Sequence, residues 1–169
     1  MRRYWNSLLL VLCIILISAS VFAAPVKRGG YVAVTEGKQG VLVQNFNPFS
    51  PNALQSTGGN FYETLVLSNN YTGQIQPWLA ESYSWSEDLL TLTFKLRDHV
   101  YWNDGNKFTA DDVVFTIMLS KDNPALDLGG IWQNGLQEVK KLDDYTVQLV
   151  FDQVNVPVLV KIASIYIVP

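Results

Sequence analysis

The clearest pattern in the sequence is an alternation of apolar and polar residues over positions 90–96. One face would carry Leu90, Leu92, Phe94 and Leu96, and the other Thr91, Thr93 and Lys95. A period of two places successive side chains on opposite sides of a strand, so this segment is predicted to be a half-buried β-strand. A similar alternation predicts a strand over 31–36. The runs at 136–142 and 145–151 predict a hairpin that turns at Asp143-Asp144.

Helical spacing replaces this alternation at three other places. In segment 111–119 the apolar residues on one side are Val113, Val114, Ile117 and Met118, which predicts a helix. A second short helix is predicted over 156–162, starting near Pro157, and one or two helical turns over 61–67. Turns are predicted at 69–76 and 103–106, and a long loop at 45–60, because these segments are rich in Asn, Pro, Ser and Gly.

The stretch VYWNDGNKFTADDVVFTI, residues 100–117, has the carboxylates that a calcium loop or a catalytic pair would need. A calcium loop built on Gly105 would place Trp102 and Val100 where acidic or amide ligands are required, so that pattern fails. Asp111 and Asp112 are adjacent and point about 100° apart on a helix, so they do not converge on one substrate atom. Thr109 as N-cap, with two carboxylates in the first turn, is the better explanation, and the stretch is interpreted as architecture.

The N-terminal 23 residues form a segment of a different kind. Arg2 and Arg3 precede an apolar run over 8–17, and Val21 and Ala23 occupy the −3 and −1 positions of a signal-peptidase site. This pattern predicts a cleaved signal peptide over 1–23 and a periplasmic or extracellular protein; an uncleaved N-terminal anchor is the alternative. Cys13 is the only cysteine, and the residue before it is the large Leu12, so lipidation is not expected.

Composition and motifs narrow the possible functions. The 169 residues carry a net charge of −3 and 49% hydrophobic residues, which suits one folded domain and gives no basic stripe for a nucleic acid. The sequence has no nucleophile elbow, phosphate-binding loop or zinc-protease motif, and its only histidine is His99. We therefore expect a non-enzymatic protein that needs no metal or cofactor. Phe94, Trp78, Trp85 and Trp102 are expected in the core.

An ordered series of short motifs gives the sequence a family resemblance. The motifs are NPF at 47–49, YETL at 62–65, PWLAES at 77–82, FKLR at 94–97, WNDG at 102–105 and ADDV at 110–113. Together they resemble the family 5 extracellular solute-binding proteins, the oligopeptide- and dipeptide-binding components of ATP-binding-cassette (ABC) importers. The resemblance implies a mixed α/β fold of the two-lobed, type II-like periplasmic-binding-protein kind, with an extra subdomain in the first lobe.

Residues 24–169 then correspond to the start of lobe one plus that small subdomain. Family members are several hundred residues long, and the apolar segment 163–169 lacks a polar end, so a truncated gene or a fragment is expected. The resemblance implies capture of an oligosaccharide or oligopeptide, delivery to the subunits of an ABC permease, and a monomer. The alternatives are a secreted polysaccharide-active enzyme or its accessory carbohydrate-binding domain, and a nonfunctional truncated paralogue.

Two loops combine aromatic rings with amides, the groups that bind sugar faces and hydroxyls or peptide backbones. The candidate ligand-binding residues are Gln44, Asn45, Phe46 and Asn47 in the first loop and Trp132 and Gln133 in the second. Phe46, Phe49 and Trp132 could instead be core or surface aromatics of the fold. Some members of the family bind β-linked oligosaccharides instead of peptides, and the aromatic- and amide-rich loops make this chain similar to that subset. The resemblance therefore places an oligosaccharide ahead of a peptide.

Overall fold

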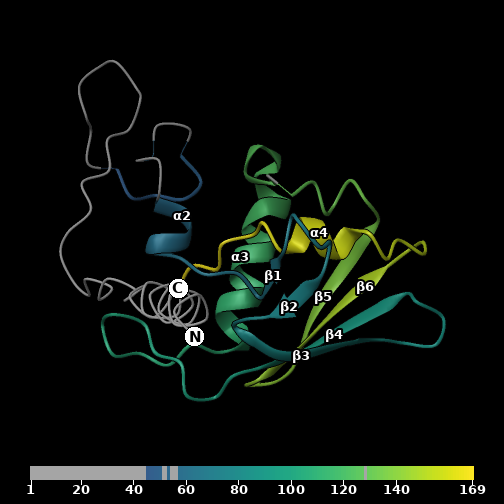
Figure 1. Cartoon of the computed structure of the whole chain (residues 1–169), viewed down its shortest axis with the longest axis horizontal. Helices are drawn as coiled ribbons and strands as arrows, with labels where there is room; N and C mark the ends of the chain where they lie inside the picture. The colour runs from purple at the N-terminus through teal and green to yellow at the C-terminus, as the bar shows by residue number, and fades with distance from the viewer. Residues whose placement is uncertain (1–44, 51–52, 54–56, 128) are drawn as a thin grey trace, which may run out of the picture. The chain divides into compact units, whose positions relative to one another are not determined.

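The computed structural model describes residues 45–50, 53, 57–127 and 129–169. The predicted signal peptide 1–23, the predicted strand 31–36 and the candidate binding residue Gln44 lie outside these ranges. Within them the helices and strands mix as expected for an α/β fold (Figure 1). None of the helices described there combines the length and apolar character needed to cross a membrane.

The main layer is a four-stranded antiparallel sheet in the order β3-β4-β6-β5. Its strands are β3 (Ala80–Trp85), β4 (Thr91–Leu96), β5 (Leu136–Asp143) and β6 (Thr146–Phe151). The predicted strand is β4, and the predicted hairpin across Asp143-Asp144 is β5–β6, so both predictions are confirmed. In β4 the alternation works as expected: Leu92, Phe94 and Leu96 are buried, whereas Lys95 is exposed.

Helix α3 (Ala110–Asp122) starts with the capping arrangement that the sequence predicted. The Thr109 hydroxyl accepts a hydrogen bond from the backbone of Asp111 at 3.3 Å. The Asp112 carboxylate in turn accepts one from the backbone N–H of Thr109 at 2.7 Å. A capping box of this kind provides acceptors for backbone N–H groups that have no partner at the start of a helix. Asp112 therefore has a structural role, as the sequence predicted.

Asp111 instead connects the helix start to the sheet. Lys141 of β5 places its ammonium 2.8 Å from both the Asp111 and the Asp144 carboxylates. Hydrogen bonds to Asp111 and then to Asp144 raise the pKa of the Lys141 ammonium above its ordinary value. The groups are exposed to solvent, so their contribution is to orientation more than to stability.

The buried side of α3 differs from the predicted one. Val113 and Ile117 are buried as expected, but Met118 and Val114 are only half-buried. Thr116 and Ser120 are buried in their place, because their hydroxyls find acceptors: Thr116 donates to Asp112 O at 2.8 Å and Ser120 to Ile117 O at 2.7 Å. The prediction counted only apolar residues, so it placed Val114 and Met118 on the buried face of the helix and missed Thr116 and Ser120.

Segment 61–67 is extended, so the prediction of helical turns there was wrong. It leads into β1 (Val66–Ser68), which pairs antiparallel with β2 (Ile75–Pro77) across the predicted turn. A short helical segment, α2 (Thr57–Asn60), precedes it. The backbone N–H of Ile167 donates to Glu63 O at 2.9 Å, so 61–67 pairs with a distant part of the chain. Tertiary pairing of this kind overrides local helical spacing.

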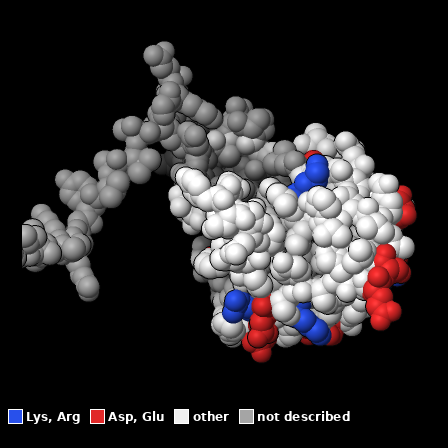
Figure 2. Space-filling model, turned by 45° about the vertical axis from the view of Figure 1, so that its right-hand side comes forward, with Lys and Arg blue, Asp and Glu red and all other residues white. Residues whose placement is uncertain are grey.

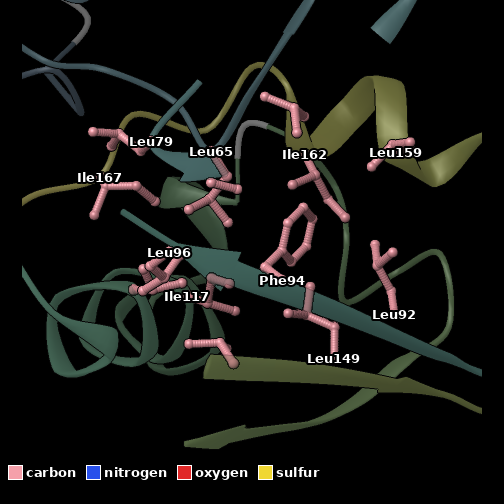
Figure 3. Close-up of a cluster of buried hydrophobic side chains, with 14 of the residues drawn as sticks. Leu65, Leu79, Leu92, Phe94, Leu96, Ile117, Leu149, Leu159, Ile162 and Ile167 are labelled. Carbon is pink, nitrogen blue, oxygen red and sulfur yellow. The ribbon is translucent and has the colours of Figure 1, made fainter. Parts of the chain in front are cut away.

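The remaining helices are short. A 3₁₀ turn, η1 (Pro124–Leu126), follows α3, and α4 (Val158–Ile162) confirms the predicted helix near Pro157. Side chains from both sheets and from α3 and α4 form one apolar cluster (Figure 3). Phe94 is fully buried in this cluster, as predicted. Trp85 and Trp102 were also expected in the core; they are partly buried and pack against the cluster. Trp78 was expected in the core but is 44% exposed.

Charged side chains lie mainly at the margins of one face, around a broad uncharged area (Figure 2).

One acidic group, Asp143 at the turn between β5 and β6, gives a testable pH dependence of stability. Asp143 accepts hydrogen bonds from the Tyr145 backbone and the Thr146 hydroxyl, both at 2.8 Å. These bonds, together with nearby Lys95 and Lys141, hold the pKa of the Asp143 carboxyl below its ordinary value of 3.8.

Replacing Asp143 with asparagine is expected to flatten the acid end of the stability profile. A carboxyl with a lowered folded-state pKa contributes stability above its ordinary pKa of 3.8, and this is lost as the pH falls towards the folded value. The amide of the variant cannot titrate, but its oxygen can still accept from Tyr145. Urea unfolding between pH 5 and pH 2 should therefore show a shallower decline for Asp143→Asn; parallel declines would contradict the assignment.

Candidate functional site

The first candidate loop is shaped by its own amides. The Asn45 side chain donates to Ser50 Oγ at 2.8 Å and accepts from the Asn47 backbone at 3.0 Å. The side-chain carbonyl oxygen of Asn47 accepts from the backbone of Phe49 at 3.0 Å. Asn45 therefore uses both ends of its amide inside the loop, whereas Asn47 is exposed and uses its oxygen there.

Phe46 presents part of its ring to solvent. It is 42% exposed, and its ring centroid lies 4.9 Å from that of Phe61. The two rings are tilted by 56°, a geometry that aromatic pairs favour. Phe46 thus has one supported side and one open side, which is the arrangement that a stacking platform requires.

The second candidate loop is held against the C-terminal half of α3. The Asp127 carboxylate accepts hydrogen bonds from the backbone of Ile131 at 2.9 Å and of Trp132 at 3.1 Å. Trp132 Nε1 donates to Ile117 O and Ser120 Oγ, both at 3.1 Å. The indole N–H of Trp132 therefore anchors the loop to the helix and is not free for a ligand.

The side chains of Trp132 and of the next residue, Gln133, are both accessible to solvent, in part for Trp132 and to a greater extent for Gln133. Trp132 is half-buried, and the Lys121 ammonium lies 4.8 Å from its ring centroid, within cation–π range. Gln133 is exposed. The structure thus leaves an exposed amide beside an anchored aromatic ring.

The two candidate loops approach each other around a small cavity of about 20 Å³. Pro48 and Phe49 line it from the first loop, and Asp127 and Gly129 from the second. Ser120, which binds the Trp132 indole, lines it as well. The structure therefore brings the neighbourhoods of the two loops together, although the five predicted residues that the structure describes do not line this cavity.

A larger cavity of about 310 Å³ lies elsewhere in the fold. Its walls are Asn60, Phe61, Glu63, Leu79, Val100, Tyr101, Trp102, Asn103 and Phe108. Trp102 Nε1 is buried and, among the described residues, is the only such side-chain nitrogen or oxygen without a hydrogen-bond partner. Phe61 connects this cavity to the first candidate loop through its contact with Phe46.

Sequence reasoning did not predict the contributions of Asp127, Ser120 and the walls of the large cavity. Asp127 had a usable signal, because an aspartate just before Gly129-Gly130 commonly binds nearby backbone N–H groups in a turn. Ser120 had none, since its role depends on Trp132 meeting α3. Within the described ranges, no group of three or more His, Cys, Asp or Glu side chains could hold a metal ion.

Comparison with protein families gives one match, and it covers more than half of the chain. Residues 74–169 match the family described as bacterial extracellular solute-binding proteins, family 5 Middle. A relative, the dipeptide-binding protein of Escherichia coli K12, is 33% identical in an alignment 165 positions long, which covers 86% of this chain and 30% of the relative. The chain spans about a third of the length of the curated relatives that it matches.

Solved structures agree in fold. A Thermotoga maritima periplasmic oligopeptide-binding protein, crystallised with mannohexaose bound, is 34% identical with a TM-score of 0.67, over 74% of this chain and 23% of that one. A Helicobacter pylori periplasmic binding protein in complex with the peptide STSA is 27% identical with a TM-score of 0.61, over 73% of this chain and 28% of that one. The described residues therefore have part of the periplasmic-binding-protein fold.

Proposed function

The chain belongs to the bacterial extracellular solute-binding proteins of family 5, and on this premise we propose that it works in solute capture for an ABC importer. It is exported, is not lipidated, and occupies the periplasm or the cell exterior. Residues 24–169 form the start of the first lobe and a small subdomain of a two-lobed binding protein. Ligand contacts favour the closed arrangement of such lobes, which a membrane permease then recognises.

The proposed ligand is a neutral oligosaccharide, with an oligopeptide as the second candidate. The single observation that carries this choice is the pairing of aromatic and amide groups on two adjoining loops. Phe46 and Trp132 offer ring faces to the apolar side of a sugar, and Asn47 and Gln133 offer exposed amides to its hydroxyls. The mannohexaose bound to the Thermotoga maritima relative supports the same choice.

The candidate residues divide into two roles in this proposal. Asn45 shapes the first loop, because both ends of its amide are already bonded. Phe46, Asn47, Trp132 and Gln133 contact the ligand, and Gln44, which lies outside the described residues, is kept as a candidate contact. Binding proceeds without bond cleavage, since the sequence carries no recognisable catalytic arrangement.

Calorimetric titration of the purified chain with mannohexaose, and with the peptide Ser-Thr-Ser-Ala, tests this function. We expect saturable mannohexaose binding with no release of reducing ends. Phe46→Ala and Gln133→Ala should each weaken it by about fivefold, the effect of losing one stacking or hydrogen-bond contact. The matched control is Tyr71→Ala, which removes a fully exposed ring in the turn between β1 and β2.

The outcomes separate the alternatives. Tighter binding of the peptide than of mannohexaose would move the chain to the peptide-binding group while keeping its capture role. Release of reducing ends would identify a polysaccharide-active enzyme and overturn the proposal. A folded chain that binds neither ligand would match a nonfunctional paralogue and overturn it as well.

A further inference from the structure

The large cavity has the size of a small-molecule site, and none of the five predicted ligand-binding residues that the structure describes lines it. Its volume of about 310 Å³ lies at the lower end of the range for ligand pockets. The walls come from segment 60–63, from Leu79 and from the hairpin over 100–108. Phe61 of this wall contacts Phe46 of the first candidate loop, so the cavity adjoins that loop, but a ligand held in it would not need the loop that carries Trp132.

The charge of the cavity wall has one sign. Among the described residues, Glu63 is the only acidic or basic residue that lines it, since the other polar walls are Asn60, Asn103 and Tyr101. Glu63 is exposed, and in the described part of the chain no Lys, Arg or His forms an ion pair with its carboxylate. Its backbone oxygen, by contrast, accepts from Ile167 and fixes the position of the residue.

Half of the other described residues that line the cavity are aromatic: Phe61, Tyr101, Trp102 and Phe108. Phe108 is buried and meets Trp102 edge-on, with ring centroids 6.2 Å apart and planes at 77°. Phe61 and Tyr101 are 55% and 57% exposed, so they are not core residues. A carboxylate among several aromatic rings is the arrangement that recognises substituted ammonium groups, because the ring faces attract a cation that has already shed part of its water.

We propose that this cavity binds a small organic cation, a substituted ammonium with an apolar body. Glu63 acts as its counter-ion, and Phe61, Tyr101 and Trp102 enclose its alkyl groups. This inference goes beyond the proposed solute-capture function and does not depend on it. A neutral sugar also suits rings and amides, but it would leave the Glu63 carboxylate without a counter-charge.

Lys107 offers an independent check on the role of charge. It is the antiparallel bridge partner of Tyr101, and its side chain is exposed. Directly opposed residues of an antiparallel pair project to the same face, so we expect the ammonium of Lys107 on the Tyr101 side, although Lys107 itself does not line the cavity. A cation in the cavity should be repelled by it.

Choline and its neutral isostere 3,3-dimethyl-1-butanol test the proposal, because they share shape and a hydroxyl but differ in charge. In calorimetric or NMR titrations of the purified chain, choline should bind at least about fivefold more tightly than the isostere, the scale of a cation–π contact. Glu63→Gln should weaken choline binding by about threefold to fivefold, as for an exposed ion pair, and leave the isostere unchanged.

Three further variants locate the site. Tyr101→Ala should weaken choline binding, Lys107→Gln should strengthen it, and Glu87→Gln, an exposed carboxylate outside the cavity, should leave it unchanged. Equal affinity for the two probes, no choline binding, or an unchanged affinity in Glu63→Gln would each overturn the proposal. Loss of mannohexaose binding in Glu63→Gln would also overturn it, by assigning the cavity to the glycan.

Discussion

Replacing Phe94 with alanine is expected to lower the free energy of unfolding by about 3–5 kcal/mol, the usual cost of removing a buried phenylalanine ring. Phe94 is 0% exposed and lies on β4, an inner strand of the four-stranded sheet. Figure 3 shows its ring pointing from β4 towards Ile162 of α4. The ring of Tyr83 on the neighbouring strand lies 6.2 Å away, so the substitution also removes an aromatic contact.

A loss of this size is a large part of the stability of a small domain, which is about 5–15 kcal/mol in total. Urea unfolding followed by circular dichroism measures it, with Phe115→Ala as the matched control. Phe115 is on α3 but is 49% exposed, so its removal should cost little, and alanine favours the helix. A Phe94→Ala loss no greater than that of Phe115→Ala would show that the sheet–helix core is not packed as described.

The sequence predicted those parts of the fold where one local signal decides the structure. The alternation at 90–96 became β4, because one face of that strand packs on the core while the other meets solvent. Thr109 and Asp112 predicted the start of α3, because unpaired backbone N–H groups need acceptors wherever a helix begins. Signals of this kind depend on neighbours within a few residues.

The sequence failed where distant segments decide the structure. Segment 61–67 has apolar residues that fit a helix as well as a strand, and short apolar runs are ambiguous in this way. Its extended form depends on hydrogen bonds from Trp78 and Ala80 to Leu65 O, both at 3.0 Å. These partners lie more than ten residues away, so no local pattern could report them.

The candidate site shows the same division. Phe46 and Gln133 were predicted from composition, and the structure leaves both exposed. Trp132 was predicted as a ligand platform, yet its indole nitrogen bonds to α3, a contact that depends on how the loop folds back. The Glu63 cavity escaped prediction entirely, because its walls come from segment 60–63, Leu79 and segment 100–108, which are far apart in the sequence.

Replacing Gly135 with alanine is the second large effect that we expect, a loss of about 2–4 kcal/mol in the free energy of unfolding. Gly135 has φ +96°, a conformation that residues with a side chain rarely adopt. A methyl group there would also lie 2.6 Å from Asp152 Oδ1 and 3.1 Å from Gln153 Cγ. Both atoms belong to exposed side chains that can move, so backbone strain is the larger part of the expected loss and crowding the smaller part.

Gly105→Ala separates the two causes. Gly105 has a similar φ of +89°, but in the described part of the chain no atom outside the two neighbouring residues would lie within 4 Å of an added methyl group. Its substitution should cost only the backbone strain, about 1–2 kcal/mol. Urea unfolding of both variants then gives the crowding as the difference between their losses. If Gly135→Ala costs no more than Gly105→Ala, the close approach of Asp152 is not a constraint.

Gly135 lies next to the second candidate loop, so comparing Gly135→Ala with Gly105→Ala also tests the proposed binding function. Its carbonyl oxygen accepts from the Asp152 backbone at 2.9 Å, and the next residue, Leu136, begins β5. The loop that carries Trp132 and Gln133 is thus held by Asp127 at one end and by Gly135 at the other. Because a displaced Gly135 would shift that anchorage, Gly135→Ala should weaken mannohexaose binding under conditions where Gly105→Ala, equally folded, does not.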